Sequence, residues 1–394
     1  MKQILLGFLL ALTVSACQDK AQPAKPPTTP KDTIVTPKHY LHLVGTIKDL
    51  PITMDLNFFK PPKKWDWMLQ EGYYTGSYYY DKYQEPIEVW QYQDTTGVII
   101  LSERYAYDEE NRFVGNFENG VFKGKWYDGY RRFSFPFELR PDTSANAVPL
   151  EFMTYYDAFE LFKGKEESPV AEFSIGALWP LFYKDEATTT FLQKEFLKIL
   201  APDSLAATVN APKGYFLKAK QNYFRAYADA MREEEESLGE NEEGYFPNYS
   251  EQQDMKVIWN EDGLLSIGAL WYEYSGGAHG NYGSTYYTFD VKNKALLTEE
   301  AIFQQNFVEK VAQALKNSAE RTYDSDSQDF SPLEDMALDA LKPNGNFYVT
   351  GGGIGYNFVP YEVGPYALGE ITLFIPKTEI LEVLKPSFKT RMGW

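Results

Sequence analysis

Three side chains in the C-terminal third of the chain have the types needed for acid/base chemistry. Glu273, His279 and Asp290 supply a carboxylate, an imidazole and a second carboxylate within a short stretch. A hairpin between Glu273 and Asp290 would bring them near one another, where they could transfer a proton or hold one metal ion. Strand alternation leaves open which faces Glu273 and His279 occupy, and His279 has the alternative of hydrogen-bonding its own loop. The three residues define a hydrolase hypothesis.

Two glycine-rich loops that carry tyrosines offer a non-catalytic alternative. They lie at residues 274–281 and 360–369. Tyr gives large contact area at small entropic cost and Gly permits close approach, so such loops suit recognition of another molecule. Two alternatives stay open, namely that Gly276 and Gly277 only serve positive-φ turns and that Tyr361 is packed beneath a sheet. The residues expected to contact a partner are His279, Asn281, Tyr361, Pro365 and Tyr366.

The sole cysteine, Cys17, follows an apolar stretch at residues 4–14 and two small residues. With a lysine near the amino end, these are the parts of a secretory signal, and the cysteine behind the cut supplies a thiol that can be acylated. The alternative is a secreted protein whose Cys17 is incidental. We expect a lipoprotein signal peptide at 1–16, lipidation of Cys17, and a lipid-anchored, disordered tether at 17–38 that is rich in Pro, Thr, Lys and Gln.

This signal also predicts where the protein is found. The apolar stretch is shorter than the roughly 20 residues that span a bilayer as a helix, and no later stretch is long and apolar enough to do so. We therefore expect the protein in the bacterial cell envelope, attached to a membrane by its lipid anchor only, with the outer membrane favoured over the inner. A single cysteine leaves no pair for an intramolecular disulfide.

The balance of charge narrows the classes of partner. Over 394 residues, 56 acidic residues outnumber 38 basic residues, giving a net charge of −18. Binding to nucleic acid relies on clustered Lys and Arg, so no nucleic-acid partner is expected. A cationic partner is favoured, and the alternative is acidity that serves solubility alone. The acidic run at residues 233–236 is expected to weaken the end of a helix and begin a loop, because acids there oppose the helix dipole.

Residues 39–142 are expected to form a β-rich domain, an antiparallel meander with a barrel-like arrangement. Two runs, 113–117 and 122–126, share an aromatic-x-Gly-x-aromatic pattern, as neighbouring strands with one local geometry would. Their aromatic side chains are expected in the core rather than around a ligand cavity. Further strands are expected at residues 52–58, 72–80, 87–92, 98–103 and 132–139.

A polar, turn-prone break at residues 140–146 separates this domain from an α+β region in which helices pack on an antiparallel sheet. We divide that region into a part with helices and strands at 148–254 and a C-terminal domain at 255–394. Apolar spacing and capping residues predict helices at 192–200, 217–231, 307–315 and 331–341. Turn residues predict hairpins at 255–274 and 347–359.

The two glycine-rich loops also carry a family resemblance. The segments Tyr-Ser-Gly-Gly-Ala-His-Gly-Asn at 274–281 and Pro-Tyr-Glu-Val-Gly-Pro-Tyr-Ala-Leu-Gly at 360–369 occur in the order and separation of a known domain. They resemble the extracytoplasmic domain shared by the anti-sigma factor RsiV and the peptidoglycan deacetylase PdaC. The resemblance covers about residues 255–384 and reaches faintly back to Glu151. It implies a domain that binds lysozyme in the anti-sigma factor and helps to hold the wall polymer in the deacetylase.

Two activities of these proteins are not implied. Anti-sigma factors of this kind need a cytoplasmic segment and a transmembrane helix, in whose place this sequence has a lipoprotein signal. The deacetylase owes its chemistry to a separate metal-binding domain, whereas this chain has 3 histidines. We expect a non-catalytic binding lipoprotein without cofactor or metal, whose favoured partner is a cationic lysozyme. The alternatives are a peptidoglycan or other glycan-binding module and the hydrolase that uses Glu273, His279 and Asp290.

Overall fold

The computed structural model describes residues 40–60, 70–103, 110–142, 144, 146–165, 167–201, 211–237, 244, 246–323 and 332–394. The predicted signal peptide, tether and Cys17 lie outside these residues. Among the residues that are described, no helix has the length and apolar composition needed to cross a bilayer.

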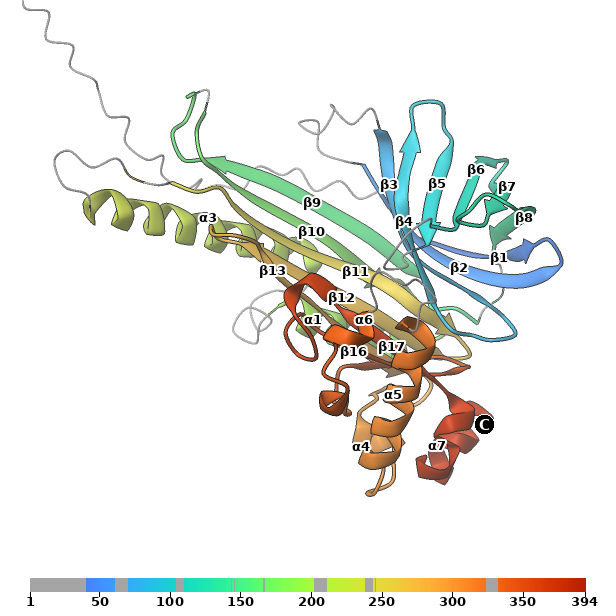
Figure 1. The fold of residues 1–394 in the computed structure, drawn as a ribbon. Helices are drawn as coiled ribbons and strands as arrows, with labels where there is room; N and C mark the ends of the chain where they lie inside the picture. Colours follow the sequence, from blue (N-terminus) through green and yellow to red (C-terminus); the bar gives the residue numbers. More distant parts are fainter. Residues whose placement is uncertain are drawn as a thin grey trace, which may run out of the picture.

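The N-terminal strands form a closed antiparallel barrel, drawn in blue to teal in Figure 1. Each strand pairs with the next, and β1 closes the barrel by pairing with β8 from Leu43↔Pro141 to Ile47↔Phe137. This confirms the predicted β-rich, barrel-like architecture. The strands are β1 (Tyr40–Ile47), β2 (Leu50–Phe59), β3 (Gln70–Tyr80), β4 (Ile87–Asp94), β5 (Ile99–Glu103), β6 (Arg112–Glu118), β7 (Val121–Tyr127) and β8 (Ser134–Pro141).

The repeated aromatic-x-Gly-x-aromatic runs lie on β6 and β7, where their glycines, Gly115 and Gly124, are direct cross-strand partners. A Cβ on Gly115 would fall 2.8 Å from the Phe137 ring, so the absence of a side chain at Gly115 leaves room for this ring. Phe113 and Phe122 are 0% exposed and meet Phe137 edge-on inside the barrel. The prediction that these aromatic side chains are core is confirmed for both phenylalanines.

A six-stranded sheet follows the barrel, in the order β14-β13-β12-β11-β10-β9. All neighbours are antiparallel except β10 and β11, which pair in parallel from Ala171↔Tyr249 to Gly176↔Asp254. A parallel pair needs a crossover, and two helices supply it. The elements are β9 (Leu150–Glu160), β10 (Val170–Pro180), α1 (Glu186–Leu200), α3 (Pro212–Ser237), β11 (Tyr249–Glu261), β12 (Leu264–Tyr274), β13 (Asn281–Asp290) and β14 (Ala295–Leu296).

The crossover helices cover one face of this sheet. Helix α1 begins at the N-cap Asp185, whose carboxylate accepts a hydrogen bond from the Thr188 backbone N–H at 2.7 Å. Phe196 of α1 is 0% exposed and stacks on Phe289 of β13, and Phe216 and Phe224 of α3 are equally buried in the same core. The predicted helices at 192–200 and 217–231 are confirmed.

The other face carries a C-terminal layer, drawn in orange and red in Figure 1. A three-stranded sheet, β15-β16-β17, packs here, and Ser266 of β12 donates a hydrogen bond to the Val349 carbonyl of β15 at 2.6 Å. The layer consists of α4 (Glu299–Ile302), α5 (Val308–Tyr323), α6 (Pro332–Asp335), η2 (Leu338–Ala340), β15 (Phe347–Val349), β16 (Gly353–Phe358), η3 (Tyr366–Leu368), β17 (Ile371–Pro376), η4 (Lys377–Glu379), η5 (Leu381–Val383) and α7 (Pro386–Met392).

Two predictions for the helices are wrong in detail. The acidic run at residues 233–236 remains helical, because α3 continues to Ser237. The unfavourable dipole interaction is typically below about 1 kcal/mol and is screened by solvent, so upstream packing of α3 outweighs it. The helix expected at 331–341 ends at Asp335 instead and is followed by the separate turn η2.

The barrel is joined to the six-stranded sheet by a buried junction. Tyr79 of β3 stacks on Trp259 of β11 with ring centroids 4.6 Å apart, and both residues are 1% exposed. The Asn260 side chain accepts a hydrogen bond from the Val148 N–H at 2.7 Å and donates to the Val148 carbonyl at 2.9 Å. It also donates to the Tyr40 hydroxyl at 2.9 Å. One side chain thus ties β1, the chain entering the sheet, and β11 together.

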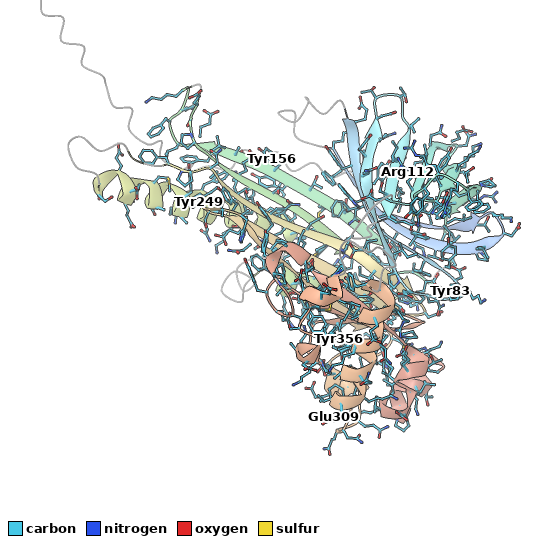
Figure 2. All side chains as sticks on the ribbon, viewed as in Figure 1. Tyr83, Arg112, Tyr156, Tyr249, Glu309 and Tyr356 are labelled. Atoms are coloured by element: carbon cyan, nitrogen blue, oxygen red, sulfur yellow. The ribbon has the colours of Figure 1, made fainter. Side chains whose placement is uncertain are left out.

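Further contacts extend the junction to the C-terminal layer. The turn between β3 and β4 carries Tyr83, labelled in Figure 2, and the neighbouring Gln84 carbonyl accepts a hydrogen bond from Thr350 at 2.7 Å. Lys256 of β11 pairs with Glu88 of β4 at 2.5 Å.

The division expected between residues 254 and 255 falls inside β11, so the segments 148–254 and 255–394 share one sheet.

Candidate functional site

The first glycine-rich loop connects β12 to β13 at the end of their hairpin, where Glu273 and Asn281 are the last paired residues. Gly276 and Gly277 have φ angles of 92° and 100°, a region that side-chain-bearing residues rarely adopt. The positive-φ role considered for these glycines is thus what the structure shows. At the end of the loop, a Cβ on Gly280 would fall 2.6 Å from the Tyr272 ring, so glycine is required there for the tyrosine to pack.

The second loop connects β16 to β17 and has an unusual backbone at its tip. Tyr361 has a φ of 72°, which is strained for a residue with a bulky side chain. The Glu362 carboxylate helps to hold this conformation, because it accepts hydrogen bonds from the Val359 N–H at 3.0 Å and from Asn344 at 2.8 Å. The Tyr361 ring is 64% exposed. The alternative that it packs beneath the sheet is therefore wrong.

The two loops meet, although they are far apart in sequence. The His279 ring stacks on the Tyr366 ring with centroids 3.9 Å apart and planes 22° from parallel. Tyr361 and Tyr282 each lie 5.7 Å from Tyr366, the latter edge-on. The Tyr366 hydroxyl donates a hydrogen bond to the Gly280 carbonyl at 2.7 Å. We call His279, Tyr282, Tyr361 and Tyr366 the aromatic cluster.

The imidazole of His279 contacts both loops through its two nitrogens. Its Nδ1 lies 2.9 Å from the Gly280 carbonyl oxygen, which can only accept, so Nδ1 carries a proton. Its Nε2 faces the Tyr361 hydroxyl at 3.4 Å. The histidine therefore bonds its own loop, the alternative considered from the sequence, and links that loop to the second one.

Buried polar groups beneath the cluster fasten the second loop to β13. The Glu370 carboxylate accepts hydrogen bonds from the Ser284 hydroxyl at 2.8 Å and from the Asn357 side chain at 3.1 Å. Asn357 is 0% exposed and also donates to the Ser284 carbonyl at 3.0 Å. These residues were not predicted from the sequence. The surface above them is held in place before any partner arrives.

The other two residues expected to contact a partner do not join the aromatic cluster. Asn281 is exposed and is paired with Glu273 on the neighbouring strand. Strand alternation from the buried residues of β13 turns its side chain towards the helix-covered face, away from Tyr282. Pro365 is exposed and precedes η3, which carries Tyr366.

The acid/base constellation of Glu273, His279 and Asp290 is not assembled. Asp290 lies at the far end of β13, about 30 Å along the strand at its usual rise per residue. There it forms a buried bidentate ion pair with Arg391 at 2.9 and 3.1 Å. Glu273 shares a sheet face with buried Ile267, so it points away from the aromatic cluster.

Glu273 faces Glu251 across β11 and β12 instead. Burial raises the pKa of the Glu251 carboxyl, a hydrogen bond from Gln253 opposes this, and the charge of Glu273 raises it further. Within the described part of the chain, no group of three His, Cys, Asp or Glu side chains is arranged to hold a metal ion.

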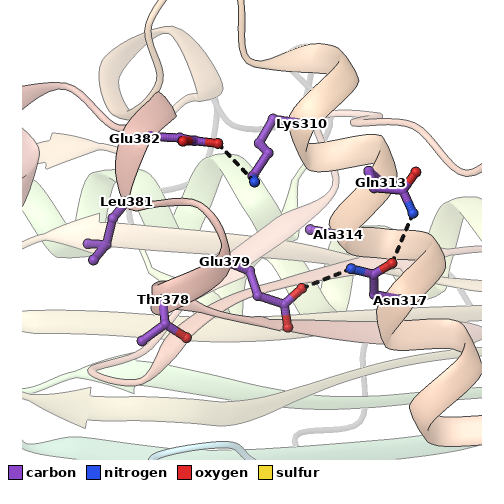
Figure 3. A pocket seen from close by; sticks show the side chains of 8 residues that line it. All are labelled: Lys310, Gln313, Ala314, Asn317, Thr378, Glu379, Leu381 and Glu382. Carbon is purple, nitrogen blue, oxygen red and sulfur yellow. Dashed lines mark hydrogen bonds and ion pairs between the residues drawn. The ribbon is translucent and has the colours of Figure 1, made fainter.

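A separate groove of about 340 Å³ lies between α5 and the turns η4 and η5 (Figure 3). Its charged side chains are already paired: Lys310 binds Glu382 at 2.8 Å, and Glu379 binds Arg321 at 2.8 Å. Asn317 accepts a hydrogen bond from Gln313 at 2.9 Å. The groove contains none of the aromatic cluster and is lined by side chains that satisfy one another.

Comparisons with known proteins identify the domain type of the C-terminal region. Residues 166–282 match the family described as Deacetylase PdaC, and residues 295–378 match the family described as Protein of unknown function (DUF3298). The first loop, at 274–281, thus falls within one match, and the second loop, at 360–369, falls within the other. The chain therefore carries regions similar to these two domain families. No curated protein matches the chain.

The solved structures that are similar to this chain include two DUF3298 family proteins. A DUF3298 family member from Bacteroides fragilis is 21% identical with a TM-score of 0.54, and the match covers 64% of this chain and 100% of that chain. A DUF3298 family protein from Pseudomonas aeruginosa is 18% identical with a TM-score of 0.39, and the match covers 62% of this chain and 97% of that chain. The first similarity supports a common fold, and its low identity carries no inference about function.

Proposed function

We propose that this protein is a non-catalytic binding lipoprotein of the cell envelope that captures a cationic protein of the lysozyme type through the aromatic cluster. The observation that carries the proposal is the convergence of two distant loops into one exposed surface on a buried polar support. Tyr361 is 64% exposed on this surface, while Glu370 and Asn357 fix its base. A preordered surface loses little conformational entropy when a partner binds.

The distribution of charge supports a cationic partner. Residues 148–254 hold 20 acidic and 10 basic residues, and residues 255–394 hold 18 and 11. The β-rich region at 39–142 is closer to balance, with 16 and 12. The sheet and its covering layers thus carry most of the net negative charge. Such a field steers a cationic protein to the aromatic cluster and raises its association rate.

The resemblance to the extracytoplasmic domain of RsiV supports lysozyme as the class of partner, because that domain binds lysozyme.

A second candidate is a glycan such as peptidoglycan. The near-parallel stacking of His279 on Tyr366 favours it, because flat aromatic faces also pack against sugar rings. The two candidates differ in their response to salt, since charge-steered capture weakens with ionic strength and stacking on a neutral sugar hardly responds.

Lipidation of Cys17 and attachment to a bacterial membrane, with the outer membrane favoured, belong to the same proposal. We expect Cys17→Ser to abolish incorporation of a labelled fatty acid into the protein. Label that persists in this variant would contradict the anchor without bearing on the aromatic cluster.

The binding test uses the full chain, a purified cationic lysozyme, and biolayer interferometry at low and high salt. Truncation of Tyr361 to Ala should weaken capture by about tenfold or more, as expected when a large aromatic contact residue is removed from an interface. Tyr130→Ala is a matched control, because Tyr130 on the barrel is 63% exposed against 64% for Tyr361.

Equal affinity in wild type and Tyr361→Ala, or an equal loss in both variants, would contradict the site. Capture that depends on Tyr361 yet does not respond to salt would exclude a charge-steered partner and favour the glycan. Binding of peptidoglycan fragments by the same variants then decides for that candidate.

A further inference from the structure

The loop between β7 and β8, at the end of the barrel, exposes apolar side chains that the core does not use. Tyr130 is 63% exposed and Phe133 is 60% exposed. Two arginines, Arg131 and Arg132, lie between them in sequence. Isolated exposed aromatics are ordinary, but two large rings on one short loop form a local apolar patch.

Hydrogen bonds hold this loop in one conformation. Its Gly129 N–H donates to the Asn111 side chain at 2.8 Å, which ties the loop to the neighbouring strand β6. Asp128 organises the rest, because its carboxylate accepts from the Phe133 N–H at 2.6 Å and its carbonyl accepts from the Arg131 N–H at 2.8 Å. The two rings are therefore presented outward by an ordered loop.

Cationic groups cover the aromatic rings of this region. The Arg132 guanidinium lies 4.6 Å from the Tyr130 ring centroid and 5.9 Å from that of Phe133. Next to the loop, the β1–β2 turn is fixed by a hydrogen bond from the Lys48 N–H to the Pro136 carbonyl at 2.7 Å. The Lys48 ammonium lies 5.3 Å from the Phe135 ring centroid.

The β1–β2 turn also adds Leu50, which is 56% exposed, to this end of the barrel. We call Lys48, Leu50, Tyr130, Arg131, Arg132 and Phe133 the barrel tip. Asp49 and Asp128 are the acids on the same two turns, and Asp128 lies 3.4 Å from Arg132. Three cations against two acids leave this tip positive in a chain whose net charge is −18.

This combination is suited to the interface of an anionic bilayer. Tyrosine places its ring among acyl chains and headgroups with its hydroxyl in water, and arginine packs its stem on apolar surface while its charge reaches phosphate. Each Lys or Arg near an anionic surface contributes about 1 kcal/mol. The acidic remainder of the protein is repelled by the same lipids. Electrostatic interactions therefore orient the protein with the tip towards the bilayer.

We propose that the barrel tip docks on the anionic lipid surface of the membrane, as a second contact besides the lipid anchor. The chain enters the barrel at Tyr40, at the opposite end of β1 from the tip, so the connection must reach around this strand. The 22 residues from Gln18 to His39 extend to at most about 75 Å. The eight residues of β1 span only about 26 Å, so the connection is long enough.

The test measures co-sedimentation of the full chain with vesicles of phosphatidylglycerol or of phosphatidylcholine. All proteins carry Cys17→Ser, so that the apolar leader contributes equally and no lipid anchor is present. The Arg131→Gln/Arg132→Gln variant should bind phosphatidylglycerol about 30-fold more weakly, as expected for two arginines at an anionic surface. Tyr130→Ser/Phe133→Ser should also weaken binding, by roughly tenfold.

Two control variants test whether position matters. Tyr361→Ser removes an equally exposed tyrosine at the aromatic cluster, and Arg140→Gln removes an arginine that is 69% exposed and paired with Glu138. Both should bind phosphatidylglycerol vesicles like the parent. Thermal unfolding checks the fold, and Arg131→Gln alone replaces the double variant if the latter unfolds early, with about a fivefold loss expected.

Equal sedimentation with both lipids, or undiminished binding by the arginine variants, would overturn the proposal. Arginine-dependent binding to soluble polyphosphate without preference for phosphatidylglycerol vesicles would also overturn it, because the tip would then recognise a free anionic polymer. None of these outcomes touches lysozyme capture, which involves the opposite charge and other residues.

Discussion

Tyrosine and histidine side chains gather at two places, the junction between barrel and sheet and the aromatic cluster. Their roles at these two places are opposite. At the junction, Tyr40 and His42 converge on Asp55, and the His42 Nδ1 lies 2.8 Å from its carboxylate. At the aromatic cluster, His279 and Tyr366 converge on a backbone carbonyl. The junction residue Tyr79 is 1% exposed, whereas Tyr361 of the cluster is 64% exposed.

This difference shows that burial, more than residue identity, separates a structural tyrosine–histidine arrangement from one available for recognition. A substitution in a buried arrangement lowers the free energy of unfolding, because the cavity or unpaired group left behind has no access to water. An open arrangement leaves stability nearly unchanged and affects only what it contacts. The comparison can be tested by substitutions at both places.

The largest effect is expected from Trp259→Ala at the junction. Trp259 is 1% exposed and stacks on Tyr79, so its removal should lower the free energy of unfolding by about 3–5 kcal/mol. Tyr361→Ala should change it by less than about 0.5 kcal/mol, as is usual for exposed side chains. Denaturant unfolding followed by fluorescence and circular dichroism measures both. Comparable losses in the two variants would break the comparison.

A smaller effect is expected from pH. Burial raises the pKa of Glu261 beside the junction to about 7, the charge of His42 opposes this, and Asp81 adds to it. The folded chain therefore holds a proton that the unfolded chain releases near the ordinary carboxyl pKa of 4.5. The contribution of Glu261 to the free energy of unfolding is therefore fully present below that pKa. It is lost as the pH rises towards 7, by roughly 2 kcal/mol after solvent screening.

Two other groups act in the same direction. Burial raises the pKa of Asp254 to about 7. Burial lowers the pKa of His42, but the charge of Asp55 and its hydrogen bond raise it, and the net direction is upward. Unfolding free energies measured between about pH 5 and pH 8 should show the decline, and Glu261→Gln should flatten it. A profile that rises with pH, or one unchanged in this variant, would exclude Glu261 as its source.

The smallest effect is expected from Tyr366→Phe. This change removes the hydrogen bond to the Gly280 carbonyl and keeps the ring, so the free energy of unfolding should fall by about 1 kcal/mol or less. Capture of lysozyme should weaken a few-fold, because the first loop loses its tie to the second. Tyr183→Phe removes a similar bond, to the Asn146 carbonyl, far from the loops and should not alter capture. Loss of capture in both variants would point to a general effect.

The strands and most helices could be predicted because their patterns are local. Turn residues such as Gly263 and Gly352 and alternating apolar residues mark hairpins within a few positions. Closure of the barrel depends on β1 finding β8 across the whole domain, and strand periodicity carries no information on that pairing. The persistence of α3 through residues 233–236 was missed because packing elsewhere on the helix decides it.

The site was predictable in part for the same reason. Residue types identified both loops, and the structure brings two of the selected residues, His279 and Tyr366, into contact with each other. Glu370 and Asn357, which fasten the loops, could not be found, because their partner Ser284 lies on another strand. Asp290 was misplaced because closeness in sequence was taken as closeness in space, whereas an extended strand separates its two ends.

The parallel ladder between β10 and β11 constrains how the molecule can assemble. Every other ladder of the six-stranded sheet joins strands that are neighbours in sequence and can grow from its own turn. This one closes only after the chain has passed through α1 and α3, and the entropy of that long loop is lost before the first pair forms. The β12–β13 hairpin, which presents the first glycine-rich loop, can therefore form early. Its attachment to β9 and β10 through β11 requires that α1 and α3 have first been placed.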